Sequence, residues 1–256
     1  MSYQLIEHID MLDEVPLPEE TATYKPVPYN DFIEYARDAL RARGFVMNTN
    51  RLELARDGQQ MFGTFEVYPM LTEDGESAVT GAEPYRNEAA YRRMLGLRTS
   101  YDKSLPNGII MGAQIIVCSN LMFSGEFLVT RRHTKNVLND LPSDVFRLVG
   151  RGLEGYSDVV GMLEWMKGED VGHRQMLNDF VVRSMREGVI NSGQILRVLK
   201  EFENPTFCID GRTNSVYNLH NAFTHVIKKV NPISIVPRIS TLTEMCKQEW
   251  EYPSEN

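Results

Sequence analysis

The sequence has few cysteines, no long apolar run and no recognisable catalytic motif. Its cysteines, Cys118, Cys208 and Cys246, lie far apart and lack paired metal-ligand spacing, which argues against a zinc site or a disulfide-rich fold. No stretch approaches the roughly 18 uncharged apolar residues that span a bilayer. The chain begins with acidic residues where a signal peptide is basic and then apolar. We therefore expect a cytoplasmic protein with no membrane partner, no metal and no cofactor.

Charge is unevenly distributed along the chain, although the net charge is −8. The residues before Lys25 carry −6, those from Glu244 onward carry −3, and the rest therefore carry +1. A net negative charge argues against strong non-specific DNA binding. That objection is weaker here because the body of the chain is near neutral and its ends are acidic.

The composition predicts an ordinary folded protein, since 42% of the residues are hydrophobic and 24% are charged. Four prolines near the start indicate an extended acidic arm over residues 1–29, which can include a short strand. We expect residues 30–250 to form a single domain, sheet-rich over 30–135 and helix-rich over 136–250. Residues 251–256 are expected to form a tail.

Hydrophobic spacing predicts the order of secondary structure. A helix is expected from a cap at Asn30 or Asp31 through Arg43. Two strand-like runs then flank Asp57-Gly58, a dipeptide typical of tight hairpin turns, and three more strand-like runs follow. The predicted fold class is α+β, with a mostly antiparallel twisted sheet of about five strands over residues 45–131 followed by a helical C-terminal half.

The second half of the chain has helical spacing of its apolar residues. A long helical segment begins at Leu141, with a break expected between Gly150 and Gly155. Gly and Pro residues then separate further helices, predicted around residues 172–187, 192–202, 214–229 and 241–250.

One central run, GLRTSYDKSLPNGIIMGAQIIVCSNLMFSGEFLVTRRHTKNV, carries a family resemblance. Its arginine strand ending in Ser-Tyr-Asp-Lys-Ser, its Val-Cys-Ser-Asn, its Phe-Ser-Gly-Glu and its basic Arg-Arg-His-Thr resemble the signature of the phage/plasmid-like family known as domain of unknown function 932. A weaker similarity covers Asn221 to Thr224. The resemblance implies a mobile genetic element in a bacterial host, and it implies no particular activity.

Basic residues gather around that motif. Arg131, Arg132, His133 and Lys135 follow a strand closely, and such a patch can contact nucleic-acid phosphates. The alternative is a solvated strand end whose arginines pair with Glu126 or Glu83. The predicted nucleic-acid-binding residues are Arg98, Tyr101, Lys103, Arg131, Arg132 and Lys135, with Tyr101 as a base-stacking ring.

The segment Asp102-Lys103-Ser104 has two interpretations. A Lys beside an Asp can bind phosphate or activate a nucleophile. The same residues are also common in a hairpin turn capped by Ser and Asp. His220 and His225 are five residues apart, so on a helix they point in different directions and do not share a metal. We assign no catalytic residue.

Three functional hypotheses follow. The leading one is a non-enzymatic phage or plasmid accessory protein that binds single-stranded nucleic acid, as annealing proteins do, and that can form a homo-oligomer. The second is an inhibitor of a host defence or regulatory protein, whose acidic arm occupies a basic surface. The third is an enzyme that acts on nucleic acid or nucleotides around Asp102 and Lys103.

Overall fold

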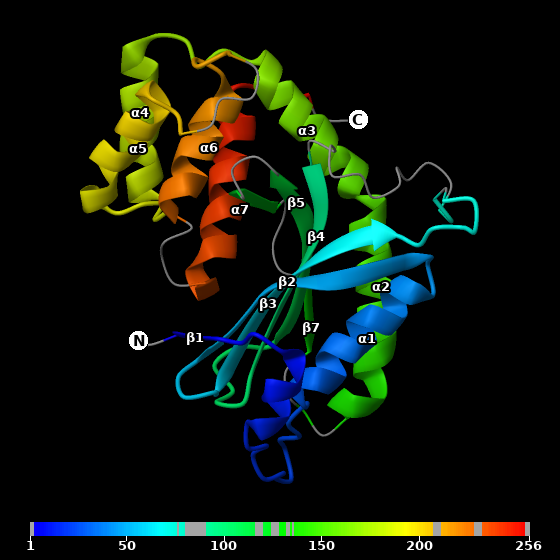
Figure 1. Ribbon diagram of the computed structural model, residues 1–256. Helices are drawn as coiled ribbons and strands as arrows, with labels where there is room; N and C mark the ends of the chain where they lie inside the picture. Colours follow the sequence, from blue (N-terminus) through cyan, green and yellow to red (C-terminus); the bar gives the residue numbers. More distant parts are fainter. Residues whose placement is uncertain are drawn as a thin grey trace. The chain divides into compact units, whose positions relative to one another are not determined.

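The computed structural model describes residues 3–75, 77–79, 91–115, 120–123, 128–131, 134, 136–206, 211–227 and 232–253. It confirms the predicted α+β class, with an antiparallel sheet in the N-terminal half and helices in the C-terminal half (Figure 1). The chain divides into two compact units. A sheet unit comprises Met1–Gly112 and Phe127–Gly155, and a helical unit comprises Ala113–Glu126 and Tyr156–Asn256.

The strands of the sheet unit follow one another in sequence order. Neighbouring strands run β1-β2-β3-β4-β5, and β7 pairs with β5. The hairpin predicted at Asp57-Gly58 is confirmed, because Ala55 lies opposite Gln60 and both turn residues have positive φ. The strands are β1 (Tyr3–Leu5), β2 (Phe45–Ala55), β3 (Gln60–Pro69), β4 (Tyr91–Ser100), β5 (Asn107–Ile115) and β7 (Leu128–Arg131).

Two helices, α1 (Tyr29–Arg41) and α2 (Val137–Glu154), lie side by side and pack on this sheet (Figure 1). Each helix buries one apolar stripe in the core that it shares with the strands. The predicted cap is wrong: Pro28 occupies the N-cap position without a side-chain hydrogen bond, and Asn30 and Asp31 lie within the first turn. An aspartate there still interacts favourably with the helix dipole.

The N-terminal segment, predicted as an extended acidic arm that can include a short strand, belongs to the sheet unit. Strand β1 pairs with β2, and the 3-10 helix η1 (Ile9–Glu14) packs against α1. Ile6, Leu12 and Val27 are buried in the core. These buried apolar side chains hold the segment against the sheet unit.

The helical unit is built around α6, which packs against α3, α5 and α7. The predicted break near Gly155 is confirmed, since α2 ends at Glu154 and α3 begins at Tyr156. The last helix begins earlier than predicted, because Pro232 serves as its first residue, where no backbone N–H is needed. The helices are α3 (Tyr156–Gly168), α4 (Arg174–Arg186), η2 (Ser192–Gln194), α5 (Ile195–Glu203), α6 (Val216–Ile227) and α7 (Pro232–Glu249).

The helical unit also contains the end of β5, residues 113–115, and the short strand β6 (Asn120–Phe123), which pairs with β5. Strand β6 was not predicted as an element separate from the strand-like run before it. Among the helices that the structure describes, none is long and apolar enough to cross a membrane.

Candidate functional site

One end of the sheet brings together two turns and the last residue of β7. Gln60, the first residue of β3, lies opposite both Ala55 of β2 and Ser100 of β4. The β2–β3 turn and the β4–β5 turn are therefore neighbours, and the Tyr101 amide donates to the Gln59 carbonyl at 2.7 Å. Arg131 at the end of β7 lies opposite Asn107 at the start of β5. We call residues 56–59, residues 101–106 and Arg131 the sheet end.

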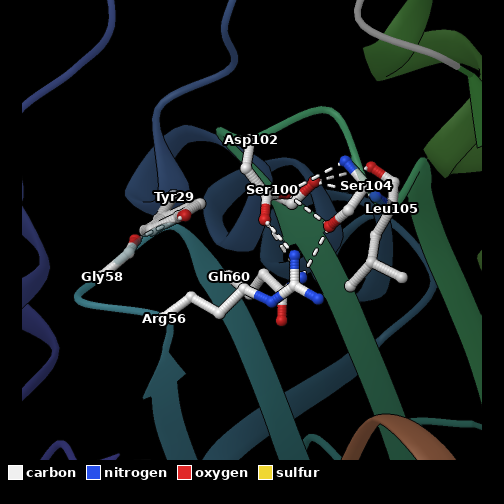
Figure 2. Close-up of polar contacts among 8 residues, drawn as sticks. All are labelled: Tyr29, Arg56, Gly58, Gln60, Ser100, Asp102, Ser104 and Leu105. Carbon is white, nitrogen blue, oxygen red and sulfur yellow. Dashed lines mark hydrogen bonds and ion pairs between the residues drawn. The ribbon is translucent and has the colours of Figure 1, made fainter. Parts of the chain in front are cut away.

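Asp102 is the centre of the polar contacts at the sheet end (Figure 2). Its carboxylate accepts hydrogen bonds from Arg56 Nη1 at 3.0 Å, Gln60 Nε2 at 3.2 Å and the Ser104 amide at 2.9 Å. The Ser104 hydroxyl also donates to it. Partial burial on its own would raise the pKa of Asp102, but hydrogen bonds from Ser104, Ser100 and Arg56 outweigh it and hold that pKa below its usual range.

Three tyrosines, Tyr24, Tyr29 and Tyr101, stack and form hydrogen bonds at the β4–β5 turn. The rings of Tyr29 and Tyr101 are stacked, with centroids 3.9 Å apart and planes 6° from parallel. The Tyr24 hydroxyl donates to the Tyr101 carbonyl at 2.9 Å, and the Tyr29 amide donates to the Tyr101 hydroxyl at 3.2 Å. Because the Tyr101 ring is 5% exposed and already stacked, it is not available to a base. Burial raises the pKa of Tyr101 to about 12.

Backbone strain accompanies this arrangement. Among the described residues, Arg56, Asp57 and Lys103 are three of the four non-glycine residues with positive φ, at 52°, 54° and 62°. A left-handed conformation costs a residue with a side chain roughly 1–2 kcal/mol. Both turns at the sheet end therefore hold cationic residues in unfavourable conformations, a feature that is often found at functional sites.

The structure brings some of the predicted basic residues to the sheet end. Lys103 is exposed there, with its Nζ 4.2 Å from the centre of the Tyr24 ring. The backbone of Arg131 lies there by its pairing with Asn107. Arg98 lies further along β4, opposite Phe62; it is half-buried, and burial lowers its pKa. Arg132 and Lys135 fall outside the described residues.

Arg56 belongs to the sheet end and was not among the residues predicted from the sequence. Its side chain is 44% exposed, and its guanidinium pairs with Asp102. The sequence signal was the Asp57-Gly58 turn directly after it, which identifies the hairpin but does not show what the hairpin lies against. The pairing joins residues 46 positions apart and depends on the register between β3 and β4.

The contacts of Asp102, Lys103 and Ser104 favour the turn interpretation over a nucleophile. In the described part of the chain, the Ser104 hydroxyl is held by Asp102 and by Gln60 Nε2, the latter at 2.6 Å, while Lys103 lies against Tyr24. A carboxylate with a lowered pKa is a weak base, so it activates a hydroxyl poorly. The Asp102 carboxylate instead fixes the shape of the turn and the position of Arg56.

Most polar residues of α6, including those of the motif at Asn221 to Thr224, are buried in the helical unit. His220 is 1% exposed, with its Nε2 3.2 Å from Thr243 Oγ1. Burial lowers the pKa of His220 to about 4. Within the described residues, no group of three His, Cys, Asp or Glu side chains could hold a metal ion. These residues therefore pack the helical unit.

Comparison of the chain with protein-family models, with curated proteins and with solved structures finds no match. The resemblance to domain of unknown function 932 therefore stays a prediction from the sequence motif.

Proposed function

We propose that the sheet end binds single-stranded nucleic acid, and that the protein is a non-enzymatic accessory factor of a phage or plasmid. The observation that supports this most is the strand register. It brings Arg56, Lys103 and the backbone of Arg131 to one end of the sheet from two turns and from the end of β7. Cations that lie along neighbouring strand ends suit the phosphates of a flexible strand.

The side chains of the sheet end carry three positive charges and two negative ones, from Asp57 and Asp102, and thus a net charge of +1. The Asp102 carboxylate pairs with the Arg56 guanidinium, so this pair contributes no net charge. Lys103 is exposed and has no carboxylate partner among the described residues. In the sequence, Arg131 is followed closely by Arg132 and Lys135. We propose that Lys103, Arg131, Arg132 and Lys135 contact phosphates.

Two residues of the predicted set have a different place in this proposal. Tyr101 supports the turn from the core and does not stack on a base. Arg98 lies half-buried beside the neighbouring strand and contributes to the local positive potential. We further propose that the protein works as annealing proteins do, with several copies along one strand, because phosphate contacts alone are independent of sequence.

Fluorescence anisotropy of labelled single-stranded DNA, duplex DNA and RNA tests this proposal. We expect salt-dependent binding that favours single strands. Replacing two phosphate contacts in Arg131→Ala/Arg132→Ala should lower affinity and reduce the slope of log K against log salt by about 1.4, since each contact contributes about 0.7 for single strands.

The matched control removes two charges from the helical unit. Arg186→Ala/Arg197→Ala changes the net charge by the same amount, and both residues are exposed. We expect this variant to keep the wild-type slope. No binding at low salt, or equal losses in the two double variants, would reject the sheet end as the binding site.

A further inference from the structure

Phe146 lies on α2 but does not belong to the buried apolar face of that helix. Helix α2 buries Leu141, Val145 and Val149 in the core of the sheet unit. Phe146 lies outside that stripe, and its side chain is 46% exposed. A single exposed ring is common on protein surfaces, so the residues around it decide whether it has a role.

The guanidinium of Arg43 lies over the Phe146 ring. Arg43 Cζ is 3.6 Å from the ring centroid, and Arg43 Nη1 donates to the Ala39 carbonyl at 2.9 Å. That carbonyl lies near the end of α1, where a cation is favourable. The hydrogen bond and the ring contact hold the guanidinium in one orientation. We call this pair the Arg43–Phe146 stack.

Gly150 makes room for the Arg43–Phe146 stack. It lies in the interior of α2, where glycine is about 1 kcal/mol less favourable than alanine. A Cβ at this position would lie 2.7 Å from Arg43 Nη2 and 3.0 Å from Arg43 Nε. The glycine therefore allows the guanidinium to lie against the helix backbone, one turn along from Phe146.

Two further cations lie on α2 near Phe146 in the sequence. Arg147 follows Phe146 directly, and Arg151 lies one turn beyond Arg147 on the same face of α2. Arg147 pairs with Asp144, whereas neither Arg43 nor Arg151 has a carboxylate partner in the described part of the chain. An exposed ring with unneutralised arginines is the combination that single-stranded nucleic acids need, because bases stack and phosphates pair.

We infer that the Arg43–Phe146 stack is a base-stacking subsite for the same single strand that the sheet end binds. This inference rests on the proposed function. Tyr29 at the start of α1 contacts Tyr101 of the sheet end, and Arg43 follows the end of α1. At 1.5 Å per residue, the two places are about 20 Å apart along the helix. One flexible strand can reach both.

Binding of a 20-nucleotide oligo-dT is compared with binding of an abasic strand that has the same phosphates. Phe146→Ala should weaken oligo-dT binding about tenfold. This loss lies within the range observed when a base-stacking ring is replaced by alanine. It should leave the affinity for the abasic strand unchanged. Gly150→Ala should act in the same direction, because the new methyl group displaces Arg43.

Two control variants come from the helical unit. Leu196→Ala removes another exposed apolar side chain, which is 69% exposed. Gly161→Ala adds a methyl group to a helix where nothing lies within 4 Å. Both should bind oligo-dT as the wild type does. As a direct reporter, Phe146→Trp should show tryptophan quenching by oligo-dT, above the background from Trp165 and Trp250.

The outcomes separate the two proposals. If wild-type protein binds both strands and Phe146→Ala binds oligo-dT equally well, the stacking subsite is overturned while the sheet end stands. Unquenched fluorescence of the Phe146→Trp variant in the oligo-dT complex would also overturn it. If neither strand binds at low salt, the proposed function fails and the subsite fails with it, which leaves the stack as a surface for a protein.

Discussion

The two units of this protein place the polar residues of their sequence motifs differently. In the sheet unit, Asp102, Arg56 and Lys103 lie in turns at the surface, where they contact one another and solvent. In the helical unit, His220 and Asn218 lie inside, and the Asn218 side chain donates to the carbonyls of Phe202 and Thr213. Surface polar groups are available to a ligand, whereas buried ones satisfy the fold.

This difference explains why similar sequence signals led to different outcomes. The motif around Tyr101 to Ser104 and the motif around Asn221 to Thr224 were both singled out by the family resemblance. The first forms a strained, partly exposed turn, and the second forms the buried face of a central helix. The sequence of a motif does not show whether its polar side chains face solvent or the core. Only the position of the motif in the fold shows this.

The largest expected effect concerns His220 in the helical unit. Its folded pKa of about 4 lies below the ordinary histidine value near 6.5. Between these values the unfolded chain binds a proton that the folded chain does not. The free energy of unfolding should therefore fall, by on the order of 3 kcal/mol, as pH drops through this window.

Urea titrations followed by tryptophan fluorescence measure this effect, because Trp165 and Trp250 both lie in the helical unit. The variant His220→Gln keeps a polar group near Thr243 but cannot titrate there, so its stability should depend less on pH. An equally steep pH dependence in this variant would assign the effect to other groups.

The second prediction compares two helix glycines. A Cβ at Gly152 of α2 would lie 2.1 Å from Met111 Cγ in the sheet unit, whereas a Cβ at Gly161 of α3 meets nothing within 4 Å. Gly152→Ala should destabilise the protein by about 2 kcal/mol through overpacking. Gly161→Ala should stabilise it by up to about 1 kcal/mol. Thermal unfolding of both variants measures the difference, and equal shifts would contradict the close packing of α2 on β5.

The third and smallest effect concerns Asp102. The variant Asp102→Asn should lose about 1 kcal/mol at pH 7, because an amide cannot accept all the donors that converge there. The folded pKa of Asp102 is lowered, so its stabilising effect is present above the unfolded pKa and is lost as pH falls through the folded pKa. The difference from the wild type should therefore shrink below about pH 4.

Hydrogen exchange of peptides that cover residues 56–60 and 100–106 measures the Asp102 effect locally. Ser143→Ala, at an exposed position on α2, is a matched control for a small polar change in the same unit. A difference between Asp102→Asn and wild type that is the same at pH 7 and pH 3 would show that the carboxylate charge does not support the turn.

Local sequence signals predicted much of the fold. The Asp57-Gly58 turn fixes a hairpin because its conformational preference lies within the turn itself. The glycines between Gly150 and Gly155 predicted the break between α2 and α3. The start of α7 was missed because Pro232 and Pro237 were interpreted as helix breakers. Pro232 instead takes the first helical position, where proline is favourable, and Pro237 lies inside the helix.

The sequence could not predict which distant segments meet. The prolines of the N-terminal segment predicted an extended arm, and no local pattern showed that Ile6 and Leu12 are buried in the core of the sheet unit. The pairing of Arg56 with Asp102 and the contact of Arg43 with Phe146 join residues that are far apart in the chain. Such contacts depend on strand register and helix packing, which no local pattern encodes.

The salt dependence of single-stranded DNA binding by Lys103→Gly tests the central claim most directly. Glycine accepts the positive φ of 62° at this position, so the variant should fold at least as well as the wild type while it lacks the exposed cation. The account predicts weaker binding and a slope reduced by about 0.7, the contribution of one phosphate contact. A wild-type slope and affinity in a normally folded Lys103→Gly protein would contradict it.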